Sequence, residues 1–576
     1  MSAVASATST ALAVRDDEAY RRRLYRLADR RRRRQPRTGA PGAGASPPGL
    51  VLLQLDGVGY EELRHAAGRG LMPTVAGWLD RSHRVMPWRT DWSSQTGASQ
   101  LGILHGSTFD VPAFRWYEKE TGDVMVCNRP RSAAELQRRA ALRTGNAGLL
   151  ARDGASRGNL FSGGADQLAL VLSVSARRDR GNRSRAGYFA YFSDPANAVR
   201  TALSFAAEVG REIGQSVRAR TRGDRPRVAR GGLYPLIRAF ATVIERDVVV
   251  AAVLGDMLAG RSAVYADLVA YDEVAHHSGP RGRDTDQILT RLDRSLALLA
   301  RVAEHAPREY RIVLLSDHGQ SPGETFLGRY GLTLKDLVRA GCGLPVPRRA
   351  DGTRSGAEAR AAVRAALHRP VEETGEEAHP EPGPDPVVLA SGNLGLISFP
   401  DLPGRASRER IERAHPALLA TLANHPGVGF LLVDGVVLGA DGARARLDVP
   451  GEAEALLAPF GPGAAEAVRR TDSFPHVADI MVNSAYDPAT GEVHAFEEQI
   501  GSHGGLGGEQ GHPFLMWPTD LSSPLPEPAP GTAPDPGPGA ELVGAEAVHT
   551  VLRRWLTEPN TPRPAPTAPG SGTTPG

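Results

Sequence analysis

Aspartate and histidine side chains occur in short groups with the character of metal ligands. Asp317 and His318 follow directly after the apolar, strand-like run 312–316. A buried strand that ends in an adjacent carboxylate and imidazole presents two unlike ligands at fixed positions. The carboxyl ends of strands in α/β sheets also form the crevice where ligands usually bind. A second pair, Asp272 and His276, spaces a carboxylate and an imidazole four residues apart. The two pairs together predict a metal site.

Three further segments carry groups that suit the same chemistry. Asp56 closes the hydrophobic strand-like run 51–55 with a carboxylate, and His503 lies in the glycine-rich loop 501–505, where the backbone can come close to an ion. Hydroxyl groups cluster just before an apolar, helix-like stretch at 101–106. Each of them is a candidate nucleophile or helix cap: Ser93, Ser94, Thr96 and Ser99.

Strand-like and helix-like segments alternate along the chain and must position these groups. Strands are predicted at 51–55 and 311–316, a short helix at 73–80, and a long amphipathic helix at 281–303. Alternation of this kind predicts an α/β fold in which helices cover both faces of a mixed or parallel sheet.

Composition excludes several classes of site. The 576 residues are 41% hydrophobic and 23% charged, which is enough to bury one large core or two ordinary ones. The only cysteines, Cys127 and Cys342, are far apart, so neither a disulfide framework nor a zinc site built from cysteines is expected. Any metal must therefore be held by Asp, Glu and His.

The chain shows no sign of membrane insertion or export. No run approaches the roughly 20 apolar residues that span a bilayer. Residues 1–14 lack the basic start and strongly apolar centre of a secretory signal. A cytoplasmic protein is the expectation, with peripheral membrane contact as the alternative.

The predicted organisation has three parts. Residues 1–48 are predicted to form a disordered or partly helical basic arm and linker, followed by a catalytic domain over 49–518. A Pro/Glu-rich surface excursion interrupts this domain at 345–390. Residues 519–576 form a Pro/Gly-rich tail with a helical island near 541–556.

The net charge is only +3, so the basic character is local to the arm, in Arg21–Arg23 and Arg30–Arg34. The arm is either a solvated tail or a weak contact for anionic membrane or nucleic acid. No stable protein partner is evident from the sequence.

These segments resemble the alkaline phosphatase superfamily, closest to its type I phosphodiesterase/nucleotide pyrophosphatase branch. That branch has a strand-end Asp-Gly, a nucleophilic Thr about ten residues before a Gly, Asp-x-x-x-His-x-x-Gly-Pro, Ser-Asp-His-Gly and a late His-Gly. This chain matches the five motifs in order, at Asp56, Thr96, Asp272 with His276, Asp317 with His318, and His503.

The resemblance implies an alkaline-phosphatase-like three-layer α/β/α sandwich and a site for two divalent ions, Zn²⁺ or alternatively Mn²⁺. It assigns one ion to Asp56, Asp317, His318 and the Thr96 oxygen, and the other to Asp272, His276 and His503. Thr96 would attack a small phosphorylated substrate and form a phosphothreonine, which water activated at the second metal would hydrolyse.

One residue departs from the family pattern. Ser99 stands three residues after Thr96, where the family has an Asn that helps to hold a phosphoryl oxygen; its hydroxyl is predicted to donate the same hydrogen bond at shorter reach. The neighbouring serines remain rival nucleophiles, and His277 remains a rival of His276. His105, His476 and His512 are expected to be structural, and Asn393 to be a turn residue.

The expected activity is hydrolysis of phosphodiester or nucleotide pyrophosphate bonds. The alternatives are a phosphomonoesterase, a phosphonate hydrolase or a phosphoglycerol-transfer enzyme on the same fold, because the fold does not fix the substrate. A non-catalytic protein that binds anionic surfaces is the alternative from another class.

Overall fold

The structure is a computed structural model. The predicted basic arm lies outside the described residues except for Pro47 and Pro48, and so does most of the predicted excursion at 345–390. The described residues are 47–174, 191–193, 195–223, 225–346, 385–525 and 541–558.

An eight-stranded mixed sheet forms the centre of the larger lobe, with the strand order β20-β2-β19-β8-β1-β7-β5-β6. β1 (Gly49–Leu55) lies between β7 (Ala263–Leu268) and β8 (Tyr310–Leu315) and is parallel to both. Every residue of β1 is buried, as expected for a parallel strand covered on both faces. The other strands are β2 (His83–Arg89), β5 (Gly154–Arg157), β6 (Gln167–Ala169), β19 (Phe514–Pro518) and β20 (Leu542–Val543).

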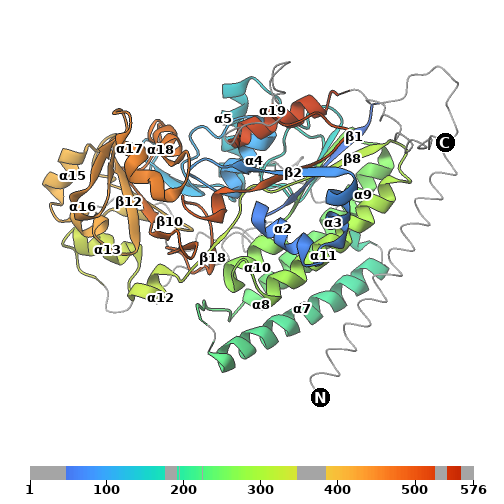
Figure 1. Ribbon diagram of the computed structural model, residues 1–576, viewed down its shortest axis with the longest axis horizontal. Coiled ribbons are helices and arrows are strands. Elements are labelled where there is room, and N and C mark those ends of the chain that lie inside the picture. The colour runs from blue at the N-terminus through green and yellow to red at the C-terminus, as the bar shows by residue number, and fades with distance from the viewer. Residues whose placement is uncertain are drawn as a thin grey trace, which may run out of the picture.

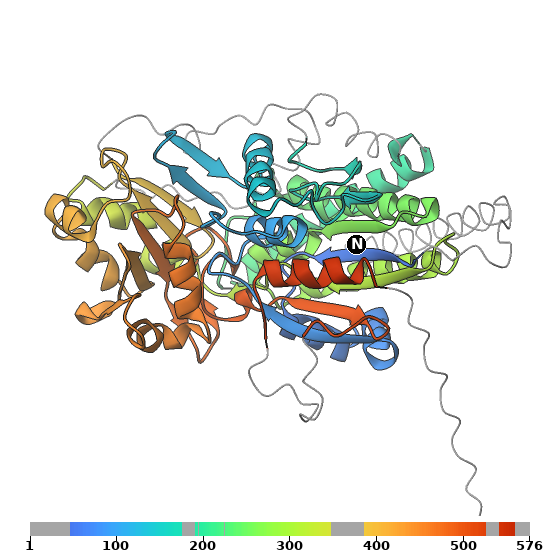
Figure 2. The ribbon, with the colours of Figure 1, turned by 90° about the horizontal axis from the view of Figure 1, so that it is seen from above.

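Helices cover both faces of this sheet and make three layers (Figures 1 and 2). Val51, Leu53 and Leu55 of β1 share one hydrophobic core with the helices of one layer. Leu50 and Leu52 point into the core of the opposite layer. The first layer contains α2 (Tyr60–Gly68), α3 (Pro73–Arg81), α9 (Arg246–Ala259), α10 (Ala270–Ser278) and α11 (Arg283–Ala303). The second contains α4 (Thr96–His105), α5 (Pro130–Thr144) and α19 (Ala545–Trp555).

A smaller lobe lies beside this sandwich, on the left in Figure 1, and is built on a separate six-stranded sheet. Its strands all pair antiparallel, in the order β10-β11-β15-β12-β13-β14. The strands are β10 (Val387–Ser391), β11 (Leu394–Ser398), β12 (Val428–Val433), β13 (Val436–Leu438), β14 (Arg444–Arg446) and β15 (Ile480–Ser484). The helices around them include α12 (Phe326–Tyr330), α13 (Leu334–Gly341), α15 (Arg408–Ala414), α16 (Leu418–Ala423), α17 (Glu452–Leu457) and α18 (Ala464–Asp472).

The segments that sequence periodicity defines agree with these elements. The strand expected at 51–55 is β1 and that at 311–316 is β8; the helix expected at 73–80 is α3 and that at 281–303 is α11. The predicted α/β class with a mostly parallel central sheet is confirmed. Within the described residues, no helix combines the length and the apolar character needed to cross a bilayer.

Candidate metal centre

Three neighbouring parallel strands bring the predicted ligands together. β1 ends at Leu55, just before Asp56, and β8 ends two residues before Asp317. β7 leads into α10, whose first turn carries Asp272. Because the carboxyl ends of parallel strands meet at one edge of a sheet, the three carboxylates converge there. All three side chains are almost fully buried.

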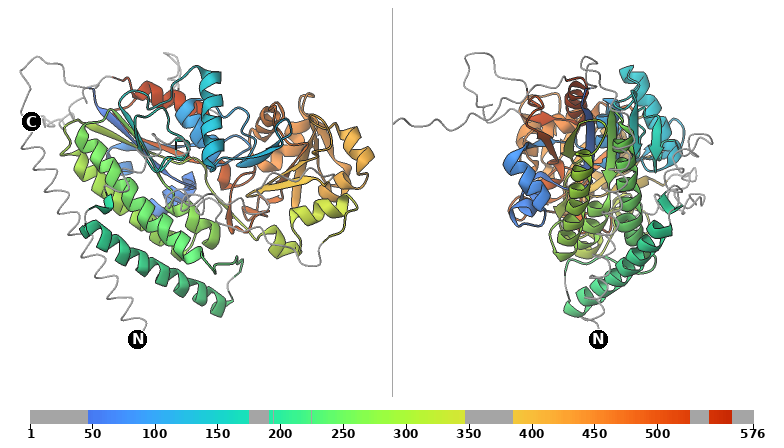
Figure 3. Two further views of the ribbon diagram at one scale, coloured as in Figure 1. Left: turned by 180° about the vertical axis from the view of Figure 1, so that it is seen from behind. Right: turned by 90° about the vertical axis from the view of Figure 1, so that its right-hand side faces the viewer.

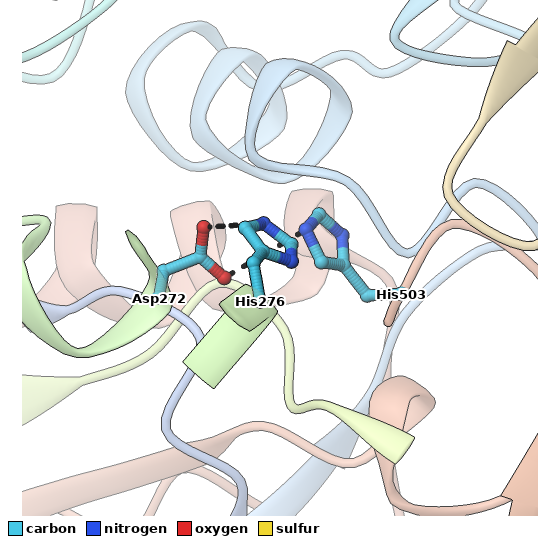
Figure 4. A group of neighbouring side chains, drawn as sticks. All are labelled: Asp272, His276 and His503. Atoms are coloured by element: carbon cyan, nitrogen blue, oxygen red, sulfur yellow. Dashed lines mark ion pairs between the residues drawn. The ribbon is translucent and has the colours of Figure 1, made fainter. Parts of the chain in front are cut away.

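The first ligand group consists of Asp272, His276 and His503 (Figure 4). The Nε2 atom of His276 lies 2.9 Å from Oδ2 of Asp272, and Nε2 of His503 lies 3.7 Å from Oδ1 of the same carboxylate. Asp272 and His276 are one helical turn apart on α10. His503 reaches them from the loop that follows β18 (Gly501–Ser502).

The second group consists of Asp56, Asp272 and His318. The Nε2 atom of His318 lies 3.5 Å from Oδ1 of Asp56 and 3.5 Å from Oδ2 of Asp317. The resemblance to the family motifs implied that Asp272 holds only the ion bound by His276 and His503. In the structure its carboxylate belongs to both groups, so the two groups are adjacent.

The three imidazoles are held in the same tautomer. Each Nδ1 atom lies within hydrogen-bond distance of a backbone carbonyl oxygen, at 2.9 Å for His276, 2.9 Å for His318 and 2.8 Å for His503. A carbonyl oxygen only accepts, so Nδ1 must carry the proton and donate. The lone pair of each neutral imidazole therefore sits on Nε2, the atom that faces the carboxylates. This is the arrangement that outer-shell hydrogen bonds impose on metal-binding histidines.

Electrostatics in the cluster also fit a divalent cation. Burial holds the pKa of His503 well below its ordinary value, which keeps the ring neutral. Burial raises the pKa of Asp272, but the neighbouring imidazoles of His276, His503 and His318 together outweigh burial and hold this pKa below its usual range.

Oδ2 of Asp317 is buried and accepts no hydrogen bond among the described residues. Neutral imidazole nitrogens and carboxylate oxygens are all acceptors, so their close approach requires protons or cations between them.

Thr96 is the hydroxyl that meets this cluster. Its Oγ1 atom lies 3.1 Å from Nε2 of His318 and 3.5 Å from Oδ1 of Asp56. Thr96 is the first residue of α4, where the backbone N–H groups have no acceptors within the helix. The positive end of the helix therefore lies at the threonine oxygen.

The sequence left three serines as rivals of Thr96. Ser94 accepts a hydrogen bond from the Gly504 N–H and donates one to the Gly505 carbonyl, so its hydroxyl holds the loop of His503. Ser99 lies one turn into α4, buried, and Oγ of buried Ser93 has no hydrogen-bond partner among the described residues.

Two positioning residues were not recognised as such from the sequence. Gln320 donates a 2.5 Å hydrogen bond from Nε2 to Oδ1 of Asp272 and so fixes the carboxylate shared by both groups. Asn393, expected to be a turn residue, accepts a 2.9 Å hydrogen bond from the Gly505 N–H. The smaller lobe thus helps to hold the loop of His503. The one sequence signal for the role of Gln320 was its place two residues after the predicted ligand His318.

The rival His277 and the histidines expected to be structural lie away from the cluster. The ring of His277 stacks on Tyr234 with centroids 3.8 Å apart, while its neighbour His276 faces the cluster. His476 pairs with Asp110, and Nδ1 of His512 bonds the Gly508 carbonyl. His105 is buried within α4.

Comparison with known proteins identifies the family. Residues 50–382 match the family described as Type I phosphodiesterase / nucleotide pyrophosphatase. The chain belongs to that family. The resemblance seen in the motifs is confirmed, and the protein is a phosphoester hydrolase. No curated protein sequence matches the chain.

Two solved structures are similar to it in outline. Phosphonoacetate hydrolase from Sinorhizobium meliloti 1021, in complex with phosphonoformate, is 16% identical; the match covers 90% of this chain and 98% of that chain, with a TM-score of 0.41. Wild-type alkaline phosphatase PafA is 12% identical; the match covers 83% of this chain and 92% of that chain, with a TM-score of 0.44.

Proposed function

We propose that the protein hydrolyses phosphodiester or nucleotide pyrophosphate bonds by nucleophilic attack of Thr96 at a site for two divalent ions. The observation that carries the proposal is the position of the Thr96 hydroxyl, 3.1 Å from Nε2 of His318 at the start of α4. Membership of the type I phosphodiesterase family supports the reaction class.

The protein groups that would hold the ions follow from the two ligand groups. Asp56, His318 and Oδ2 of Asp317, which accepts no hydrogen bond among the described residues, would hold one ion, and His276 with His503 the other. Asp272 belongs to both groups and could serve either ion. Mixed imidazole and carboxylate ligands suit Zn²⁺, with Mn²⁺ as the alternative. Bound ions supply Lewis acidity that stabilises negative charge on the attacking and leaving oxygens.

The protein's own groups orient and stabilise the reaction. Oγ1 of Thr96 lies 3.1 Å from Nε2 of His318 and so stands beside the ligand atoms of one ion, and the N-terminus of α4 stabilises the negative charge that develops there. Oγ1 gives its proton to water and bonds to phosphorus while the bond to the leaving oxygen breaks. The leaving oxygen keeps the electron pair of that bond and takes a proton from water, and a phosphothreonine results. Water then releases the phosphoryl group and restores Thr96. Burial of the cluster keeps other solvent out.

The role of Ser99 follows from its place in this geometry. It lies three residues after Thr96 on α4, and residues with this spacing share one helix face. Its hydroxyl therefore suits a hydrogen bond to a phosphoryl oxygen, as proposed from its place in the family motif. Replacing it should lower substrate binding without removing the nucleophile.

The test is a comparison of Thr96→Ala, Ser99→Ala and Ser93→Ala on nitrophenyl phosphodiester, phosphomonoester and phosphonate substrates, with zinc or manganese added. We expect Thr96→Ala to abolish turnover on every substrate while its metal content stays normal, and the diester to be the preferred substrate of the wild type. Turnover by Thr96→Ala near the wild-type rate would exclude Thr96 as the nucleophile. A preference for the monoester or the phosphonate would reject the proposed substrate class but keep the site.

A further inference from the structure

Helix α7 (Pro195–Arg222) buries charged side chains and exposes apolar ones, the reverse of an ordinary surface helix. Its buried positions include Glu208 and Glu212, whereas Val199 and Leu203 on its other side are each 60% exposed. Figures 1 and 3 show α7 at the outer edge of the larger lobe, packed along α8 (Tyr234–Ala239).

The inverted face is stabilised by buried ion pairs. Glu212 accepts two 2.7 Å hydrogen bonds from the guanidinium of Arg230 and also contacts Arg238. Asp284, at the start of α11, lies 3.1 Å from Arg230. Glu212 and Asp284 are thus already paired with the buried arginines.

A cavity of about 220 Å³ opens at the C-terminal end of α7. Its walls come from the last two turns of α7, the segment 226–230, the end of α10, the first residues of α11 and Ile500. Liquid water occupies about 30 Å³ per molecule, so the cavity has room for a phosphate group with some of its hydration.

The cavity has a surplus of positive charge. Five exposed arginines line it in addition to buried Arg230, and none of the five forms an ion pair with a described carboxylate: Arg218, Arg220, Arg222, Arg227 and Arg283. Asp284 is the one acidic residue among the described residues of the lining, and it is shared between Arg230 and Arg238. Five like charges around one concavity repel one another and attract an anion strongly.

We propose that this pocket binds a phosphate group, carried either by a soluble phosphorylated molecule or by an anionic lipid. Guanidinium groups bind phosphate oxygens with paired, charge-assisted hydrogen bonds, and several around one cavity favour a group with more than one negative charge. The N-terminus of α11, a helix of 21 residues, also faces the cavity and adds positive potential.

The pocket is separate from the metal centre. His277 and Ser278 line it, and they directly follow His276, but no member of the ligand cluster does. The inference therefore stands or falls independently of the proposed catalytic function.

The two sources of phosphate make different demands on α7. A soluble ligand requires the arginines alone. A lipid surface would in addition contact the exposed apolar side chains that lead along α7 to the pocket, among them Leu203 and Ile213.

The test uses the full-length protein and the double variant Arg218→Gln/Arg222→Gln. Both side chains are exposed and unpaired among the described residues, so the variant should fold normally. Arg131→Gln, an exposed arginine on α5, is the matched control. The soluble probe is methylenediphosphonate, a diphosphate analogue that resists hydrolysis, followed by isothermal titration calorimetry. The lipid probe is sedimentation with phosphatidylglycerol vesicles, with phosphatidylcholine vesicles for comparison.

We expect the double variant to lose at least about tenfold in affinity for one of the probes, and the control to match the wild type. Loss with the soluble probe assigns the pocket to soluble phosphate compounds. Loss with the vesicles, shared by Leu203→Ser/Ile213→Ser, assigns it to lipid. Because the soluble probe also chelates metal ions, the titration is repeated with His503→Ala, in which the pocket component should persist. Equal binding of both probes by the wild type and the double variant would overturn the proposal.

Discussion

Replacing Gly97 by alanine tests whether close packing behind α4 fixes the Thr96 hydroxyl. A Cβ atom at position 97 would lie 2.4 Å from Sγ and 2.6 Å from Cβ of Cys127, too close for either residue to stay in place. Overpacking of this kind costs about 1–3 kcal/mol. Alanine gains about 1 kcal/mol over glycine in a helix. Because these contacts are so short, we expect an overpacking cost of about 3 kcal/mol. After the gain from alanine, the free energy of unfolding should fall by about 2 kcal/mol.

The effect of Gly97→Ala on the free energy of unfolding should change sign when Cys127 is replaced by glycine. Cys127→Gly removes both clashing atoms, and the next neighbour of the added Cβ is Cδ2 of Phe114 at 3.9 Å, an ordinary contact. In that background only the helix preference remains, so Gly97→Ala should stabilise the protein by about 1 kcal/mol. The coupling between the two sites is then about 3 kcal/mol.

The four proteins of this cycle are compared by urea unfolding and by kcat. Displacing α4 moves Oγ1 of Thr96 away from His318, and a misplacement of 1 Å can lower a rate about 100-fold. We expect kcat to fall in Gly97→Ala and to recover in the double variant relative to Cys127→Gly. Equal destabilisation by Gly97→Ala in both backgrounds would refute the packing argument.

Three further predictions concern buried polar groups. Gln320→Ala removes the hydrogen bond to Asp272, so metal affinity measured by chelator competition should fall about 10- to 100-fold; an unchanged affinity would show that Gln320 does not hold the carboxylate. Asn393→Ala removes the acceptor of the Gly505 N–H, so it should lower the metal content. Asn424 is an exposed asparagine of the smaller lobe, and the control variant Asn424→Ala should leave the metal content unchanged. Equal metal content in both variants would argue against support from this lobe. Burial raises the pKa of Glu245 to about 7, above the value of 4.5 for the free group, so the folded wild type loses stability as pH rises from about 4.5 to 7. Glu245→Gln should remove up to about 3 kcal/mol of this pH-dependent loss in the free energy of unfolding, measured by urea unfolding at pH 5 and pH 8. The same pH dependence in the wild type and the variant would contradict the burial argument.

Local sequence patterns were sufficient for the elements that carry the ligands. β1 and β8 are mostly apolar strands that end just before Asp56 and two residues before Asp317, and α11 has regular helical spacing. The convergence of the ligands then follows from strand order, because β1, β7 and β8 are neighbours.

Local sequence patterns could not predict the smaller lobe or its contribution to the site. β11 pairs with β15 although the two strands are more than 80 residues apart in sequence, and no local signal encodes that register. The same holds for Gln320, whose partner Asp272 is 48 residues away. Nor does periodicity reveal that α7 buries Glu208 and Glu212, because their burial depends on ion pairs with Arg238, an arginine of another element.

Metal content per chain, measured by elemental analysis of the purified protein, tests the central claim most directly. Asp272 belongs to both ligand groups, and His276 and His277 are adjacent residues of which only His276 faces the cluster. The two-ion site predicts about two ions in the wild type and in His277→Ala, about one in His276→Ala, and fewer than one in Asp272→Ala. The same content in all four proteins, or none in the wild type, would contradict it.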